Sequence, residues 1–243
     1  MSIIQPLLTQ QIYDRRIAIV GGCKKAVDLN VVSKFDSIVA VNEASLSVLR
    51  GKKINGFYCY ANDARGSFEF PDCDWLGLNL AGTLHPACMD KAAKSSKMIV
   101  APYYLSPSRT PIIVTETFEW LPSFHIQLGT VPLTGLVALC HVLFFQPKEV
   151  FLTGFDFYAV GKMIRAINGY CHLIYPQWRF LRDITLTNKK ISIDETLWKV
   201  LNLDGYYFES PCQETHKFYE NQIGEPPPKT IIPHVNGEAV THA

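Results

Sequence analysis

Short runs of β-branched and other apolar residues recur along the chain, separated by turns and by segments whose apolar residues follow helical spacing. Runs of this kind, bounded by glycine or asparagine, are typical of buried strands. The predicted strands are residues 16–20, 37–41, 57–60, 97–101, 111–115, 149–153 and 206–208. The predicted helices are residues 24–35, 43–49, 86–93, 132–145 and 192–201, the last with Ser192 as its N-cap. This alternation favours an α/β fold with a doubly wound, mainly parallel sheet of the Rossmann-like type.

The pattern loosens after the predicted strand at 149–153. Residues 159–190 mix aromatic and basic residues without clean periodicity, and a stretch of this kind predicts an active-site lid. Residues 212–243 contain three consecutive prolines and few apolar residues, which is typical of a surface tail. We therefore expect one catalytic domain, residues 1–211, that includes the lid, followed by the tail.

Composition restricts where the chain acts. The formal net charge is +1, so no global field attracts nucleic acid or an acidic membrane, although a local basic groove stays open. The seven cysteines are odd in number and show no CxxC spacing, which favours a reducing, cytoplasmic environment. The longest apolar run, residues 131–145, falls short of the roughly 20 residues that span a bilayer, so we expect no transmembrane segment.

A glycine turn follows the first predicted strand. Gly21, Gly22 and Cys23 stand directly before two lysines at the start of a predicted helix. Backbone amides at such a turn can hold a phosphate group. The alternative is purely structural, because any turn from a strand to a helix tolerates glycine.

Polar residues also follow the second and third predicted strands, namely Asn42, Asn62 and Asp63. Ligands of open α/β sheets bind at the carboxyl ends of the strands, so these side chains are candidates for ligand binding. Turn formation and helix capping are equally common roles for Asn and Asp.

A third group of residues surrounds the predicted helix at 132–145. Thr134 and Gly135 open this helix, and Gly154, Asp156 and Tyr158 follow the next strand. A hydroxyl, a flexible backbone, a carboxylate and a phenol would thus meet at one edge of the sheet, which indicates a functional site. The alternative is an Asp that caps a loop and a Tyr that packs.

These residues together resemble the bacterial sialyltransferases of glycosyltransferase family 42. The likeness rests on the glycine turn, Phe35-Asp36 leading to Asn42, Gly51-Lys52-Lys53 leading to residues 57–62, and Thr134-Gly135 leading to residues 152–158. It implies a GT-A-like, inverting enzyme that transfers a sugar from a CMP-linked donor without a metal or other cofactor. By resemblance, the donor nucleotide is held by Gly22, Asn42, Thr134 and Gly135, and the departing phosphate by Tyr158.

Three departures from the family pattern change the expected site. Gly22-Cys23-Lys24-Lys25 replaces the family's Asn-Gly-Pro-Ser type of turn. Lys162 and Arg165 stand where the family has a second phosphate-binding tyrosine, and a cation can do that work. No histidine matches the family's general base, so His172 in the predicted lid is our candidate, together with Asp156. His141, inside an apolar helix, is expected to be structural.

Several functions stay open. The acceptor is a glycan by resemblance, or a hydroxylated base in DNA if the aromatic and basic residues of the lid stack on it. An ATP-dependent and magnesium-dependent pyrophosphokinase would use Asp63 and Asp156 on the metal. A non-catalytic nucleotide-binding module is the third alternative. The sequence also leaves homo-oligomer formation open.

Overall fold

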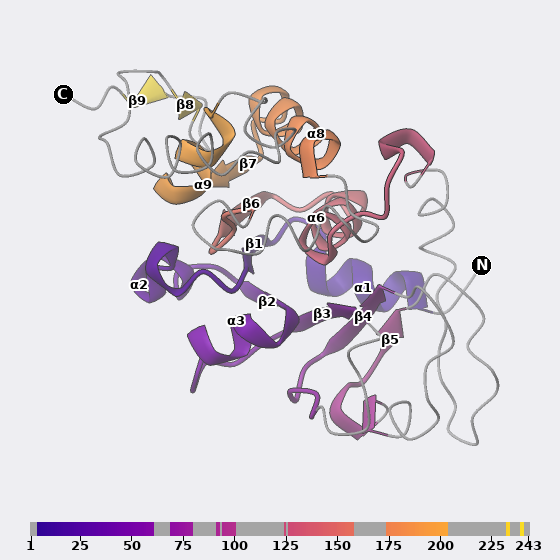
Figure 1. Cartoon of the computed structure of the whole chain (residues 1–243). Helices are drawn as coiled ribbons and strands as arrows, with labels where there is room; N and C mark the ends of the chain where they lie inside the picture. Colours follow the sequence, from indigo (N-terminus) through magenta and orange to yellow (C-terminus); the bar gives the residue numbers. More distant parts are fainter. Residues whose placement is uncertain are drawn as a thin grey trace.

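The core of the protein is a parallel β-sheet (Figure 1). The computed structural model describes residues 4–60, 69–79, 91–92, 94–100, 124, 126–157, 174–203, 232–233 and 239–240. Within these residues the sheet has seven strands, in the order β5-β4-β3-β2-β1-β6-β7. Every adjacent pair is parallel.

The elements follow one another in the alternation that the sequence predicts. The strands of the main sheet are β1 (Arg16–Val20), β2 (Ser37–Val41), β3 (Gly56–Tyr60), β4 (Trp75–Asn79), β5 (Ile99–Val100), β6 (Glu149–Thr153) and β7 (Ile191–Ile193). The helices are α1 (Ile4–Ile12), the short 3-10 helix η1 (Lys24–Ala26), α2 (Leu29–Val32), α3 (Asn42–Val48), α6 (Thr134–Phe144), α8 (Ile174–Thr187) and α9 (Glu195–Leu201). A separate antiparallel pair, β8 (Ile232–Pro233) and β9 (Ala239–Val240), lies in the predicted tail.

The order of the strands reverses at β1. Strands β2 to β5 extend the sheet on one side of β1, whereas β6 and β7 extend it on the other side. Val20 at the end of β1 therefore pairs with Ala40 of β2 and with Thr153 of β6. In a doubly wound sheet, this reversal opens a crevice at the carboxyl ends of the strands, where ligands bind. The structure thus confirms the Rossmann-like α/β class.

Both faces of the sheet are covered, as its alternating side chains require. Ile17 and Ile19 of β1 face the core cluster that contains residues of α1, α6, α8 and α9. Ala18 and Val20 face the other cluster, which contains residues of α2 and the loop after α3. Figure 1 shows α1 and α6 on one side of the sheet and α2 and α3 on the other. Burial on both faces explains why the strands read as continuous apolar runs.

Several predicted elements are confirmed. Strands at residues 16–20, 37–41 and 149–153 have the predicted bounds, and β3 begins one residue earlier than expected. Helix α6 lies inside the predicted range of 132–145, and β5 lies inside 97–101. Gly51 follows α3 with a φ of 79°, a left-handed conformation that glycine adopts without strain.

Helix α3 is shifted by one residue from the predicted 43–49, and two other predicted helices differ more from the structure. Residues 24–35 do not form one helix, because Val27 and Asp28 are extended between η1 and α2. The Asp28 carboxylate instead caps α2 by accepting a 2.8 Å hydrogen bond from the Asn30 amide. Ser192 is not an N-cap but a residue of β7, and Asp194 caps α9.

The lid stays a prediction, but its second half is helical, which the lack of clean periodicity did not predict. Within residues 159–190, those from Ile174 to Thr187 form α8, whose buried residues include Ile174, Trp178 and Leu181. Strand β4 and helix α1 were not predicted. The predicted strands at 111–115 and 206–208 lie outside the described residues, as do residues 86–90 of the predicted helix at 86–93, of which Lys91 and Ala92 are helical.

Candidate functional site

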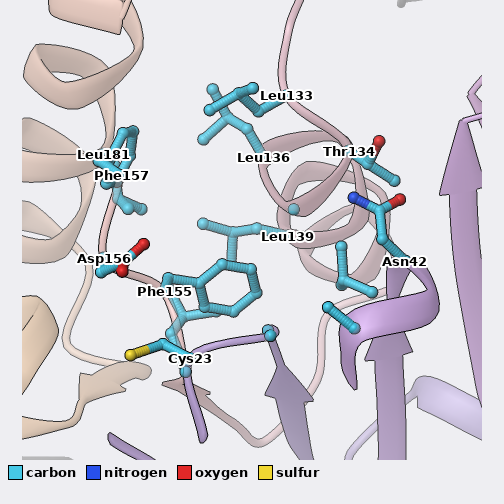
Figure 2. Close-up of a pocket in the computed structure, with 17 residues that line it drawn as sticks. Cys23, Asn42, Leu133, Thr134, Leu136, Leu139, Phe155, Asp156, Phe157 and Leu181 are labelled. Atoms are coloured by element: carbon cyan, nitrogen blue, oxygen red, sulfur yellow. The ribbon is translucent and has the colours of Figure 1, made fainter. Parts of the chain in front are cut away.

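One pocket opens at the reversal between β1 and β6, where the topology leads us to expect a ligand (Figure 2). Its volume is about 460 Å³. It is lined by every predicted site residue that the structure describes, namely Gly21, Gly22, Cys23, Asn42, Thr134, Gly135, Gly154 and Asp156. Four segments that are far apart in the sequence therefore meet at one place.

Gly21 after β1 and Gly154 after β6 bring the ends of these two strands into close backbone contact. The Gly21 amide donates a 2.8 Å hydrogen bond to the Thr153 carbonyl, and the Cys23 amide donates one of 2.9 Å to the Gly154 carbonyl. Gly154 has a φ of 76°, and a Cβ atom on it would lie 2.7 Å from the Gly21 carbonyl oxygen. A side chain at either glycine would push the two strand ends apart, so this close approach explains both residues.

A partly buried carboxylate outside the pocket lining, that of Asp194, fixes the backbone at Gly154. Asp194 accepts one hydrogen bond of 2.7 Å from the Gly154 amide and another of 2.7 Å from the Leu197 amide in the first turn of α9. Burial raises the pKa of Asp194, and the hydrogen bonds from the Leu197 and Gly154 amides oppose this rise. The sequence analysis missed Asp194, although an Asp directly before a helical segment is a known capping signal.

Asn42 is the first residue of α3 and makes the tight turn that follows β2. Its φ is 59°, in the left-handed region, where Asn is enriched over other non-glycine residues. The Ser45 hydroxyl donates a 2.8 Å hydrogen bond to the Asn42 carbonyl and thereby supports the turn. The side chain of Asn42 lies beside Thr134 at one side of the pocket (Figure 2). An amide is thus presented to a ligand as both donor and acceptor.

Thr134 and Gly135 are the first two residues of α6. The preceding residue, Leu133, provides no side-chain cap, and its carbonyl accepts hydrogen bonds from the Leu136 and Val137 amides at 2.9 and 3.1 Å. The amides of Thr134 and Gly135 therefore precede the first amides that bond within the helix. They can donate hydrogen bonds to a polar group of a ligand. Gln177 of α8 fixes this segment by accepting a 2.6 Å hydrogen bond from the Leu133 amide.

Cys23 and Asp156 lie toward the other side of the pocket from Asn42 (Figure 2). Burial raises the pKa of the Cys23 thiol, and the negative charge of Asp156 raises it further. Cys23 is therefore a neutral thiol near neutral pH, and Asp156 is the acidic side chain among the residues that line the pocket.

The rest of the lining is apolar and includes residues that the sequence analysis did not assign to the site. These are Val41, Ala44, Leu133, Leu136, Leu139, Leu152, Phe155, Phe157 and Leu181. Phe157 has a φ of 48°, which is rare for a bulky residue and marks a constrained loop after β6. The pocket combines a few polar groups with a large apolar surface, as small-molecule sites do.

The other predicted site residues, Asn62, Asp63, Tyr158, Lys162, Arg165 and His172, lie outside the described residues, so their roles stay predictions. His141 is buried in α6, as expected, and its Nδ1 atom is hydrogen-bonded to the Tyr58 hydroxyl.

The same described ranges also bear on metal ligands and on membrane spans. No three or more His, Cys, Asp or Glu residues gather there in a way that could hold a metal ion. Asp63, the predicted metal partner of Asp156, is not among those residues. No helix in these ranges is long and apolar enough to cross a membrane.

Comparison with known proteins adds no family to this picture. No family model matches the chain, and neither a curated protein nor a solved structure matches it. The fold and the pocket define the protein as a Rossmann-like α/β chain with a pocket at the reversal of strand order.

Proposed function

We propose that this protein is an inverting glycosyltransferase that transfers a sugar from a CMP-linked donor to an acceptor hydroxyl without a divalent metal. The observation that carries the proposal is the meeting of the glycine turn, Asn42 and the Thr134-Gly135 pair in one pocket. These are the residues on which the resemblance to the sialyltransferases of family 42 rests. Their separation along the chain makes this a property of the fold rather than of one motif.

The polar groups suit the nucleotide. Asn42 and Thr134 offer an amide and a hydroxyl at one side of the pocket, and the first amides of α6 lie beside them. Such donors stabilise a phosphate that gains negative charge when its bond to the sugar breaks. The volume of about 460 Å³ lies in the range of small-molecule ligand sites.

The reaction needs one proton acceptor. The bond between the anomeric carbon and the phosphate oxygen breaks, the acceptor oxygen bonds to that carbon from the opposite face, and the acceptor proton passes to a base. Asp156 lines the pocket on the side away from Asn42 and is the described side chain that can accept this proton. His172, the base candidate from the sequence, lies outside the described residues, so its role as the base stays a prediction.

The direct test is turnover. The full chain is incubated with CMP-, UDP- and GDP-linked sugars, each with glycan acceptors or hydroxymethylated DNA, in excess chelator. We expect release of CMP with transfer of the sugar, and a large loss of turnover in Asp156→Asn. Transfer to DNA alone would identify the base-modifying alternative.

Two outcomes would reject the proposal. Consumption of ATP that stops on addition of chelator would indicate the pyrophosphokinase instead. Nucleotide binding without turnover of any nucleotide sugar would indicate a non-catalytic binding module.

A further inference from the structure

The ring of Phe155 lies in the middle of the pocket. It stands below Leu139 and between Asn42 and Asp156 in Figure 2. The side chain is half-buried and packs against the core cluster that contains residues of α6. The part of the ring that lines the pocket therefore offers a fixed, flat apolar surface to a ligand.

Two glycines make room for this ring. A Cβ atom on Gly135 would lie 2.5 Å from Cε1 of Phe155, and one on Gly21 would lie 2.9 Å from Cδ1. Real Cβ atoms essentially never come closer than 3.0 Å to another heavy atom, so alanine at either position would displace the ring. One edge of the ring therefore lies close to both glycine backbones.

The φ angles do not require glycine at these two positions. Positive φ angles occur at Gly51, Gly129 and Gly154 among the described glycines, but not at Gly21 or Gly135. Gly135 is also inside a helix, where glycine is less favourable than alanine. The space for Phe155 is therefore a specific reason for the glycine at 135, whereas Gly21 also makes room for the Gly154 carbonyl.

We propose that Phe155 is a stacking platform for the planar heteroaromatic base of the ligand, and that it determines specificity for nucleotides over sugar phosphates. The inference deepens the proposed function and rests on its nucleotide donor. Aromatic rings stack on bases, since every base has a π-face. The Asn42 amide at the side of the same pocket can bond the polar edge of a base, a combination that neither a lipid nor a bare sugar requires.

The test compares ligands with and without a base. Binding of cytidine, CMP and ribose 5-phosphate to the full chain is measured by calorimetry for wild type and Phe155→Leu. The matched control is Phe151→Leu, because Phe151 lies on β6, shortly before Phe155 in the chain, but packs against the opposite cluster and stacks on Phe35. We expect Phe155→Leu to weaken cytidine and CMP about ten- to a hundredfold and to leave ribose 5-phosphate within about threefold.

The control variant should bind all three ligands like wild type. Equal losses for CMP and ribose 5-phosphate in Phe155→Leu would overturn the inference, because they would show a general structural role. Unchanged affinity for CMP, or wild-type protein that binds no nucleoside among cytidine, uridine, adenosine and guanosine, would also overturn it.

A double-mutant cycle tests the link between Phe155 and Gly135. Gly135→Ala should weaken CMP about tenfold in the wild-type background, because the methyl group moves the ring. In the Phe155→Leu background the same change should alter CMP affinity by less than about threefold. Additive losses would contradict the proposed role of the glycine.

Failure of this inference differs from failure of the proposed function. If bases bind in a Phe155-dependent way but no sugar is transferred, the stacking platform stands and the transferase does not. If sugar is transferred while Phe155→Leu keeps its affinity for CMP, the proposed transferase stands and the stacking platform does not.

Discussion

The carboxylate of Asp194 accepts a 2.7 Å hydrogen bond from the amide of Gly154, and this bond joins the start of α9 to the end of β6. Gly154 in turn lies against Gly21, so the position of the pocket lining depends on a residue that the pocket does not include. Loss of this carboxylate should therefore affect stability first and binding second.

Asp194→Ala should lower the free energy of unfolding by about 2 kcal/mol, because it removes the cap of α9 and leaves the buried Gly154 amide without its acceptor. Urea denaturation measures this loss. Asp183→Ala is the control, since Asp183 is exposed and forms only a 3.9 Å ion pair with Arg179. Equal stability of both variants would contradict the proposed role of Asp194.

His141 should make the protein sensitive to acid. Burial lowers the pKa of His141 to about 3 from its ordinary value of 6.5. Between these values the unfolded chain binds a proton that the folded chain does not, so stability falls as the pH falls from 6.5 toward 3. The contribution of this group is at most about 1.4 kcal/mol per pH unit.

His141→Gln tests this dependence, because its amide can still accept a hydrogen bond from the Tyr58 hydroxyl but does not titrate. Denaturation curves between pH 4 and 7 should show a shallower pH dependence for the variant than for wild type. Parallel curves would mean that His141 does not contribute to the acid sensitivity.

Two substitutions at Asn42 should distinguish its effect on nucleotide binding from its effect on stability. Asn42→Gly keeps the left-handed turn at a φ of 59° and removes the side-chain amide, so nucleotide affinity should fall about three- to tenfold without loss of stability. Asn42→Val should destabilise the fold by about 1 to 3 kcal/mol, because a β-branched residue is strained in this conformation. Calorimetry and urea denaturation distinguish the two effects, and unaltered nucleotide affinity in the glycine variant would remove Asn42 from the site.

Tyr158 directly follows Phe157, a residue of the pocket lining, and its predicted role concerns the departing phosphate. Tyr158→Phe should raise the barrier to transfer by about 2 to 4 kcal/mol with a smaller effect on nucleotide affinity, since it removes one hydrogen-bond donor. Tyr13→Phe, at an exposed position on the loop after α1, is the control. Normal kcat in Tyr158→Phe would assign this tyrosine to packing.

The sequence predicted the site residues that directly follow strands, but it did not predict the residue that supports them from a distant segment. Gly21, Asn42 and Gly154 each end an apolar run, so the parallel sheet alone brings them to one edge. Asp194 reaches Gly154 only because β7 pairs with β6, a contact between segments that no local pattern specifies.

Helix α8 was missed for a different reason. Gln177 and Thr185 lie on its buried face together with Trp178 and Leu181, so polar residues interrupt the apolar spacing that would reveal the helix. Gln177 is buried because it bonds the Leu133 amide and the Val131 carbonyl before α6. A polar side chain that is satisfied only in the tertiary structure looks like a surface residue in the sequence.

Titration of the full chain with CMP in excess chelator tests most directly whether the pocket holds a nucleotide. We predict one CMP bound per chain without metal, and an affinity reduced about three- to tenfold in Thr134→Val, which removes only the hydroxyl from the start of α6. Absence of CMP binding, binding that requires a divalent metal, or full affinity in Thr134→Val would contradict the assignment of the site.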